Sequence, residues 1–331
     1  MKNILLLSTG GTIASVPSET GLVPKIEGLR ILSHVPEIKN ICKVDCKAIL
    51  NLDSSNIQPE EWKLIGREVY KGLENYDGIV LLHGTDTMAY TASMLSYMIQ
   101  GLNKPVILTG SQLPLLDKDT DARENLLGAF LAAVHNIAGI YVFFGGRLIK
   151  GVRAVKTKTM SFDAFESINS VEAGFMREGT LYLSEGIPAT DICKLSFDDT
   201  IVPDVFLLKL IPGTKPEFFE HFMEMGYKGL VIEAFGLGGM HYLRRDLING
   251  IKKLIDNNIP VVITTQCLYE LSDPTVYEVG RKAYDEGVIV AYDMTSEAAV
   301  TKLMWVLGHS SDLKEIKKLM QKNICGDINK A

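Results

Sequence analysis

The chain has 331 residues, of which 47% are hydrophobic and 22% are charged, a composition typical of a globular protein with room for two domains. The formal net charge of −6 and the lack of a basic run argue against nucleic acid as the main partner, because nucleic-acid binding needs a basic face. The longest apolar runs are too short to cross a membrane, so we expect no membrane partner either.

The cysteines indicate neither a disulfide framework nor a metal centre. Their number is odd and their spacing irregular, and no histidine or second pair accompanies Cys42 and Cys46. The apolar run at the N-terminus ends too early, at Gly10-Gly11, for a secretion signal, and we predict a strand there. These features predict reduced thiols, a cytoplasmic location and no structural metal. The five cysteines are Cys42, Cys46, Cys193, Cys267 and Cys325.

The first predicted strand, residues 3–7, leads into a turn with two glycines and then Thr12. Glycines there allow unusual backbone angles and expose N–H groups, but neither a P-loop lysine nor a Gly-x-Gly-x-x-Gly pattern follows. Residues 16–25, rich in Pro, Ser, Thr and Gly, are predicted to be a surface loop beside this turn, and one that acts as a lid. Residues 27–35 are compatible with a helix.

Two further strands end in polar turns of the same kind. A strand at residues 44–50 precedes Ser54 and Ser55, and a helix at 59–70 follows. A strand at 79–82 breaks into His83-Gly84-Thr85-Asp86-Thr87, which precedes a helix with Gly101 as its expected C′ stop and then a strand at 105–108. This is a βαβ unit, and open α/β sheets build their sites at the carboxyl ends of such strands. Taken one at a time, however, these hydroxyl residues are more often helix caps.

The remaining elements follow in the same way. Asp121 is predicted to N-cap a helix, and Gly145-Gly146 to turn a two-residue hairpin. Lys156 follows the hairpin, where a lysine is usually just solvated. The patterning then weakens before strands and helices alternate again. We predict strands at 205–210, 229–234, 261–265 and 288–292, helices from 215, at 243–257 and at 276–286, and two terminal helices.

This order of elements predicts two α/β domains. The N-terminal catalytic domain, residues 1–190, should contain a larger, mainly parallel sheet with a β-hairpin. Residues 191–204 should be the linker. The C-terminal domain, residues 205–331, should contain a smaller parallel sheet with helices on both faces.

Hydroxyl side chains follow three strand ends, and three such turns on one sheet would open onto one crevice. Hydroxyl and backbone N–H groups suit a carboxylate, and a carboxylate suits an ammonium, so the crevice would fit a small zwitterion. A threonine hydroxyl is a poor nucleophile unless a neighbour activates it. The candidates are Thr12, Ser54, Ser55, Thr85 and Asp86, with Lys156 as a further one.

With these motifs placed, the chain resembles the bacterial L-asparaginase family over essentially its whole length. The order and spacing of the motifs are similar to the cytoplasmic type I branch. Two of the motifs, when found in one chain, are very specific for this family. They are Thr9-Gly10-Gly11-Thr12-Ile13-Ala14-Ser15 and His83-Gly84-Thr85-Asp86-Thr87-Met88, accompanied by Asn51-Leu52-Asp53-Ser54-Ser55, Thr109-Gly110-Ser111-Gln112-Leu113-Pro114 and Phe162-Asp163-Ala164-Phe165.

The resemblance implies hydrolysis of L-asparagine to L-aspartate and ammonia, without metal or organic cofactor. It leaves two routes open, a covalent acyl-enzyme at Thr12 or water directed by Thr85 and Lys156. By motif position, Thr12 would be the nucleophile, Thr85 with Lys156 the second catalytic threonine, Asp86 the partner of the substrate ammonium and Ser54 that of its α-carboxylate. Ser55, at a position where some relatives carry Gln, is the third substrate-binding candidate.

One position departs from the family. Many relatives carry a catalytic tyrosine in the lid, and Leu22 stands at that position here, which leaves the activator of Thr12 open. The family builds each site across a dimer, which implies a homodimer or homotetramer in which residues 267–277 reach the partner's site. Tyr269 and Glu270 are then the first candidates to face Thr12.

Two other functions fit the same motifs. The amidase subunit of a tRNA-dependent amidotransferase shares them, although such subunits usually carry an added N-terminal domain. A non-catalytic amino-acid sensor would keep the pocket but would not need Thr12, Thr85 and Lys156 together. Ammonia release from free asparagine by the purified chain distinguishes these functions from that of an asparaginase.

Overall fold

The computed structural model describes residues 1–18, 21–24, 28–187 and 194–329, and it describes no side chain between residues 16 and 29. The chain divides into two compact units, Met1–Asp199 and Thr200–Ala331. The predicted linker at 191–204 contains a short strand, β14 (Ser196–Phe197), that pairs with β6 (Ile99–Gln100) of the first unit. The domain limits given above stay a prediction, and residues 188–193, which include the first three residues of the predicted linker, lie outside the described residues.

The first unit is built on an eight-stranded sheet with the order β13-β12-β9-β8-β7-β5-β1-β4. The strands from β4 to β8 run parallel, and β9, β12 and β13 continue the sheet as antiparallel strands. The predicted mainly parallel sheet with a β-hairpin is therefore confirmed. The strands are β1 (Asn3–Gly10), β4 (Lys43–Leu52), β5 (Gly78–Leu82), β7 (Pro105–Thr109), β8 (Gly139–Phe144), β9 (Arg147–Lys150), β12 (Gly174–Arg177) and β13 (Thr180–Leu183).

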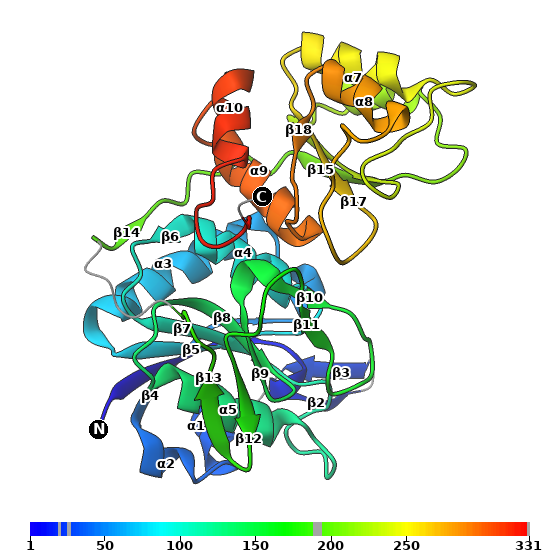
Figure 1. The fold of residues 1–331 in the computed structure, drawn as a ribbon. Coiled ribbons are helices and arrows are strands. Elements are labelled where there is room, and N and C mark those ends of the chain that lie inside the picture. The colour runs from blue at the N-terminus through cyan, green and yellow to red at the C-terminus, as the bar shows by residue number, and fades with distance from the viewer. Residues whose placement is uncertain (19–20, 25–27, 188–193, 330–331) are drawn as a thin grey trace. The chain divides into compact units, whose positions relative to one another are not determined.

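Helices cover both faces of this sheet, which explains why its central strands are nearly continuous apolar runs. Figure 1 shows α3 and α4 on one face and α1, α2 and α5 on the other. On the second face, Leu126 and Phe130 of α5 pack with Ile4 and Val80 of the sheet in one buried cluster. The helices are α1 (Gly28–Ser33), α2 (Ile38–Ile41), α3 (Pro59–Asn75), α4 (Met88–Met98) and α5 (Ala122–Ala133).

Two local predictions are wrong, and one is confirmed. Within the predicted loop at 16–25, the described residues are not irregular, because β2 (Ser15–Ser18) and β3 (Gly21–Pro24) pair as antiparallel strands with Leu22 opposite Pro17. Gly101 is not the C′ residue of α4, since that helix ends at Met98 and β6 intervenes. Its φ of 70° and the carbonyl of Lys194, with which a Cβ would clash, explain the glycine instead. The Gly145-Gly146 turn joins β8 to β9 as predicted.

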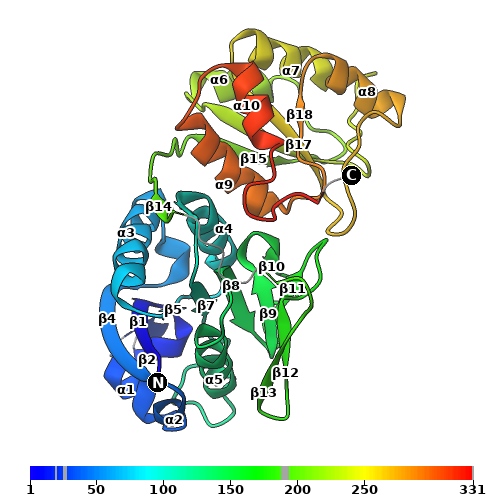
Figure 2. The same cartoon turned by 60° about the vertical axis from the view of Figure 1, so that its left-hand side comes forward.

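The second unit contains the predicted smaller parallel sheet, with the order β15-β16-β17-β18. Helices α6, α7 and α8 share one buried cluster with this sheet, α9 contacts the other face, and α10 packs on α9 (Figure 2). The alternation of strands and helices thus predicted the correct architecture. The elements are β15 (Val205–Lys209), α6 (Phe218–Glu224), β16 (Gly229–Ala234), α7 (Leu247–Asp256), β17 (Val261–Thr265), α8 (Glu278–Asp285), β18 (Ile289–Val290), α9 (Ser296–Leu307) and α10 (Leu313–Met320).

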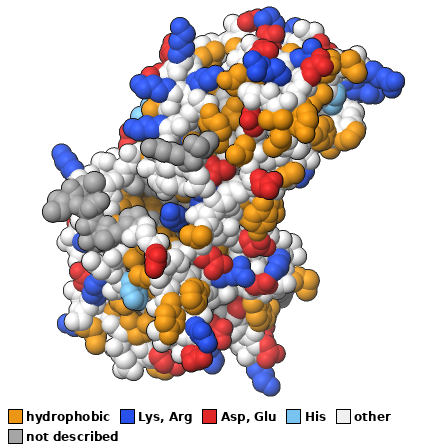
Figure 3. Space-filling model, viewed as in Figure 1, with side chains coloured by type: hydrophobic (Ala, Val, Ile, Leu, Met, Phe, Trp, Pro, Cys, Tyr) orange, Lys and Arg blue, Asp and Glu red, His pale blue; other side chains and the backbone are white. Residues whose placement is uncertain are grey.

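Acidic and basic side chains are interspersed on the face drawn in Figure 3. Among the described residues, no helix is long and apolar enough to cross a membrane, and no three potential ligands gather around a metal position. The described cysteines form no disulfide, and burial raises the pKa of the Cys42 and Cys46 thiols to about 11. Cys193 lies outside the described residues.

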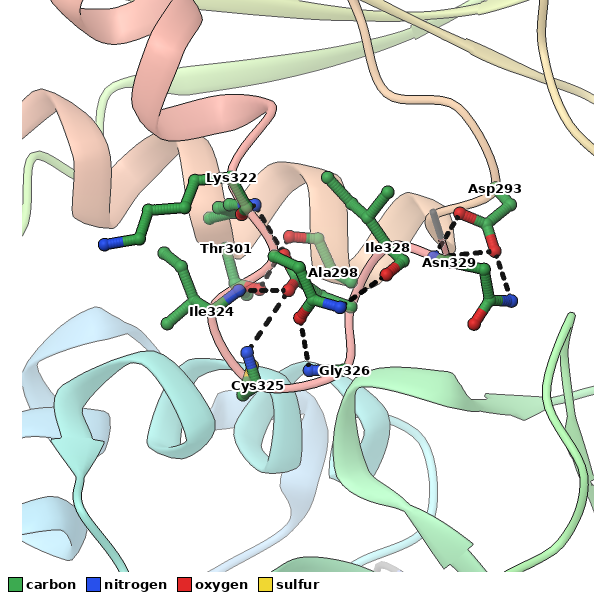
Figure 4. A network of polar contacts seen from close by, with 12 residues as sticks. Asp293, Ala298, Thr301, Lys322, Ile324, Cys325, Gly326, Ile328 and Asn329 are labelled. Carbon is green, nitrogen blue, oxygen red and sulfur yellow. Dashed lines mark hydrogen bonds and ion pairs between the residues drawn. The ribbon is translucent and has the colours of Figure 1, made fainter. Parts of the chain in front are cut away.

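After α10, residues 321–329 form a C-terminal strap that folds back over α9 and the loop after β18 (Figure 4). Lys302 of α9 and Asp327 of the strap form an ion pair of 2.5 Å, and both side chains are fully buried. Nζ of Lys302 also donates to the carbonyl of Lys322 at 2.6 Å. The side-chain amide of Asn329 donates to Asp293 at 2.7 Å. The strap therefore supplies the only carboxylate that pairs with Lys302 among the described residues.

Candidate active site

Close backbone contacts bring the three polar turns together. Strands β4, β1 and β5 are neighbours in the sheet, and Ser54, Thr12 and Thr85 follow their carboxyl ends. Gly11 has φ 79°, and a Cβ there would lie only 2.5 Å from the backbone nitrogen of Gly84. A Cβ on Gly84 would in turn lie 2.6 Å from Oγ of Ser54. Gly11 and Gly84 are therefore required by the contact between the turns, and this contact brings the turns that follow β4, β1 and β5 together.

Lys156 connects two of the predicted site residues. It ends β10 (Ala154–Lys156), which pairs with β11 (Phe165–Ser167). Its Nζ donates to Oγ1 of Thr85 at 2.7 Å and to Oδ1 of Asp86 at 2.6 Å. The Lys156 side chain is 16% exposed and that of Asp86 is 59% exposed. Lys156 is thus not a solvated surface lysine, and its charge lies between a buried hydroxyl and an accessible carboxylate.

The hydroxyl residues do not serve mainly as helix caps. Thr87 occupies the N-cap position of α4, but its hydroxyl donates to the carbonyl of Ser54 at 2.7 Å instead of accepting from the helix. After β4 the capping bond comes from Asp53, whose carboxylate accepts from the N–H of Ser55 at 2.8 Å. Ser54 is buried against Gly84, whereas Ser55 is exposed. The structure therefore brings Ser54, rather than Ser55, into the contact between the turns.

Thr12 opens a single 3-10 turn, Thr12–Ala14, and is half-buried, while Ile13 and Ala14 beneath it belong to the core. The turn is tied to the previous strand end, because the N–H of Gly11 donates to the carbonyl of Leu52 at 3.0 Å. The Thr12 side chain is thus carried by a short rigid turn between β4 and β5. The lid position, Leu22, pairs in the β2–β3 hairpin, but its side chain lies outside the described part of the chain.

His83, the first residue of the second motif, is buried and supports the motif in a way that the sequence did not predict. Nδ1 of His83 contacts the carbonyl of Gly84 at 2.7 Å, and Nε2 contacts Oγ1 of Thr91 at 2.9 Å. A carbonyl only accepts, so Nδ1 carries the proton and Nε2 accepts from the threonine. Nε1 of Trp62 donates to the same Thr91 oxygen at 3.0 Å. Burial lowers the pKa of His83 to about 4, so the ring is neutral as this chain of hydrogen bonds requires.

Asp121 has a different role from the one predicted. It occupies the N-cap position of α5, but its side chain makes no capping hydrogen bond. Its carboxylate instead accepts from the backbone N–H groups of Gln112 and Leu113, at 3.0 and 3.1 Å, and from the side chain of Asn125 at 3.0 Å. Asn125 continues to the carbonyl of Gly110 at 3.0 Å. Asp121 and Asn125 thus fix the turn after β7, which lies next to β5 in the sheet.

Comparison with known proteins identifies the family. The model described as "Asparaginase, N-terminal" matches residues 3–187, and that described as "Glutaminase/Asparaginase C-terminal domain" matches residues 204–320. The chain is 42% identical to an L-asparaginase of Thermococcus kodakarensis, over 98% of each chain. It is 38% identical to a glutamyl-tRNA(Gln) amidotransferase subunit of Pyrococcus furiosus, over 99% of this chain and 77% of that protein.

The solved structures agree with the sequence matches. The thermostable L-asparaginase from Thermococcus kodakarensis superposes with a TM-score of 0.94 at 41% identity, covering 99% of this chain and 100% of that one. L-asparaginase I from Vibrio cholerae superposes with a TM-score of 0.88 at 32% identity, covering 99% of both. These findings confirm the predicted resemblance, two-domain fold and enzyme class, and the chain belongs to the asparaginase family.

Proposed function

We propose that this protein is an L-asparaginase that hydrolyses L-asparagine to L-aspartate and ammonia. The observation that carries the proposal is the connected set of Lys156, Thr85 and Asp86, which lies beside the turn that bears Thr12. The exposed carboxylate of Asp86 can bind the ammonium of a zwitterion, while the Lys156 cation polarises the buried Thr85 hydroxyl. The relative that is 42% identical over nearly the full length is named an L-asparaginase, which supports the same substrate.

Asp86 and Ser54 are the proposed anchors for the two α-groups of the substrate. The exposed Asp86 carboxylate now pairs with Lys156, and a substrate ammonium would compete for it. The buried hydroxyl of Ser54 would receive the α-carboxylate, with Ser55 beside it. Two fixed α-groups leave the side-chain amide at one distance from Thr12, so glutamine, longer by one methylene, would be misplaced. A misplacement of about 1 Å can cost on the order of a hundredfold in rate.

In the proposed reaction, Oγ1 of Thr12 attacks the amide carbon, and the proton that the hydroxyl loses balances the proton that the leaving nitrogen gains. The Thr85–Lys156 pair carries a proton to the leaving nitrogen, which departs as ammonia. Water then hydrolyses the acyl-enzyme, releases aspartate and restores the Thr12 hydroxyl. The short contact between Lys156 and Thr85 supports this role, because a charged donor lowers the cost of negative charge on the threonine oxygen. Direct attack by water that Thr85 and Lys156 orient is the alternative route.

The mechanism is tested by Thr12→Val and Thr85→Val, which remove a hydroxyl and keep the shape of the side chain. Each should lower kcat for ammonia release from L-asparagine by at least about a hundredfold, the scale of positioned acid–base catalysis. Thr180→Val is the matched control, since Thr180 is an exposed strand residue of the same unit and should leave kcat unchanged. Near-normal turnover in a folded Thr12 or Thr85 variant contradicts the mechanism.

A second candidate function is that of an amidotransferase subunit. The chain spans 77% of several proteins named as glutamyl-tRNA(Gln) amidotransferase subunits, at 36–38% identity. Such a role predicts little ammonia from free asparagine. The purified chain should instead release ammonia from L-asparagine alone, with kcat/KM about a hundredfold above that for L-glutamine. No release from the free amino acid would favour the amidotransferase function.

We further propose that the enzyme acts in the cytoplasm as a homodimer or homotetramer in which Tyr269 or Glu270 of one protomer faces Thr12 of another. Both residues are exposed, and Glu270 holds a φ of 75°, which is unusual for a side chain of its size. Mixing inactive Thr12→Val chains with inactive Glu270→Ala or Tyr269→Ala chains should restore activity, because some sites in mixed oligomers are then intact. Light scattering that shows monomers, or no restoration, would contradict this arrangement.

A further inference from the structure

The inference starts from the proton of the Thr85 hydroxyl. Lys156 donates to Oγ1 of Thr85 at 2.7 Å, and an ammonium group has no lone pair to offer in return. The proton of Thr85 must therefore point to another acceptor. Oε1 of Gln112 lies 3.5 Å from Oγ1 of Thr85, on the turn after β7. Hydrogen bonds in unliganded active sites are often this long and shorten when substrate binds.

The far end of the Gln112 side chain fixes which atom faces Thr85. Its Nε2 donates to the backbone carbonyl of Ser161 at 3.1 Å. Because a carbonyl only accepts, the amide nitrogen must face Ser161, and the amide oxygen must then face Thr85. Gln112 thus presents an acceptor to the threonine.

The backbone of Gln112 is also fixed by hydrogen bonds. Its N–H contacts both carboxylate oxygens of Asp121 at 3.0 Å, and Asp121 is only 6% exposed. A bond from a backbone N–H to a buried carboxylate is among the stronger hydrogen bonds in proteins. The Gln112 side chain therefore extends toward Thr85 from a fixed point and does not depend on a mobile surface loop.

Ser161 belongs to the segment that directly follows Lys156. Within this segment, Lys158 forms an ion pair with Asp163, and the hydroxyl of Thr157 donates to Glu166 at 2.8 Å. Gln112 consequently joins the segment that starts at Lys156 to the hydroxyl that Lys156 contacts. A shift of that segment would therefore reach Thr85 through Gln112 as well as through Lys156.

We propose that Gln112 is a positioning residue that orients the Thr85 hydroxyl, so that its proton points to the amide and a lone pair of Oγ1 stays aimed at Lys156. The inference rests on the proposed function, in which the Thr85–Lys156 pair moves the proton of the reaction. Because Gln112 acts through Thr85, its replacement should change kcat, which reports the chemical step, more than KM.

The test compares Gln112→Met with Gln112→Glu. Methionine has a similar length but gives Thr85 no oxygen, so kcat should fall about tenfold, the scale of one lost hydrogen bond, while KM changes less than about twofold. Glutamate keeps an oxygen toward Thr85 and places a negative charge near Lys156. It should retain more kcat than methionine and shift the pH dependence of kcat to higher pH. Gln100→Met is the control, because the side chain of this half-buried glutamine bonds only the carbonyl of Tyr97 among its described contacts.

A double variant separates orientation of Thr85 from simple support of the fold. In the Thr85→Val background there is no hydroxyl to orient, so adding Gln112→Met should cost no further activity. Full kcat in Gln112→Met, or an equal loss in both backgrounds, would overturn the inference. If the methionine variant unfolds, the glutamate variant decides: an unshifted pH profile overturns the inference. If Thr85→Val is itself active, the proposed function fails instead.

Discussion

Replacing Gly11 by alanine should inactivate the enzyme through geometry alone. The new Cβ would lie 2.5 Å from the nitrogen and 2.7 Å from the Cα of Gly84, where carbon contacts normally begin near about 3.5 Å. The atoms in the way are backbone, so no side chain can rotate to make room. The turns that carry Thr12 and Thr85 must therefore separate by about 1 Å, a misplacement that can cost about a hundredfold in kcat.

Gly179 provides a matched control for the backbone conformation. Gly11 has φ 79° and Gly179 has φ 75°, but a Cβ on Gly179 would meet nothing within 4 Å. Both alanine variants pay the left-handed strain of about 1–2 kcal/mol, and only Gly11→Ala forces the strand ends apart. Thermal unfolding should show a loss of stability in both variants, larger in Gly11→Ala, and ammonia release should show a large loss of kcat in Gly11→Ala alone. Equal activity of the two variants would refute the argument that the contact between the turns assembles the site.

Three further predictions concern titratable groups. Lys156→Met keeps the length of the side chain but removes the charge that contacts Thr85, so steady-state kinetics should show a loss of kcat of about a hundredfold or more with a smaller change in KM. The pKa of His83 is lowered to about 4 in the folded protein, below its ordinary value, so as the pH drops the unfolded chain takes up this proton before the folded chain does. The free energy of unfolding should therefore decrease as the pH drops from about 6.5 to 4. Unfolding midpoints of His83→Gln should change less over that range, and a parallel decline would contradict the assignment. Burial raises the pKa of Glu297 to about 7, so the folded protein holds this proton to a higher pH than the unfolded chain does. The free energy of unfolding should therefore decrease as the pH rises from about 4.5 to 7. Glu297→Gln should therefore unfold at a higher temperature than the natural protein at pH 8 and lose this advantage at pH 5.

The elements were predictable because their signals are local. Each central strand is an apolar run bounded by a polar turn, and α6, α7, α8 and α10 each have one apolar stripe. The hairpin β2–β3 was missed because its strands lack the alternation of polar and apolar residues that marks a half-buried strand. The placement of Thr12, Ser54 and Thr85 in adjoining turns followed from their positions after parallel strands, although their roles stay predictions.

The supporting residues of the site could not be predicted, and the reason is physical. An Asp before a helix has the same sequence signature whether its carboxylate caps the helix or, as in Asp121, turns back to hold the preceding loop. His83 is the first residue of its motif, but nothing local indicates that its ring points inward to Thr91. Gln112 is visible in its motif, but its contact with Ser161 joins residues 49 positions apart. Contacts of this kind depend on the assembled fold.

The buried pair of Lys302 and Asp327 has a consequence for the order of events during synthesis. Domains fold as units while the chain emerges, the N-terminal one first. The helix with Lys302 leaves the ribosome 25 residues before the carboxylate that neutralises it. Until then, burial of α9 would leave the Lys302 cation inside the protein without its carboxylate. Removing one partner of a buried ion pair destabilises a protein by about 3–5 kcal/mol. The second unit should thus complete its folding only when residue 327 has left the ribosome. A chain truncated before that residue should be more sensitive to proteolysis than the full chain.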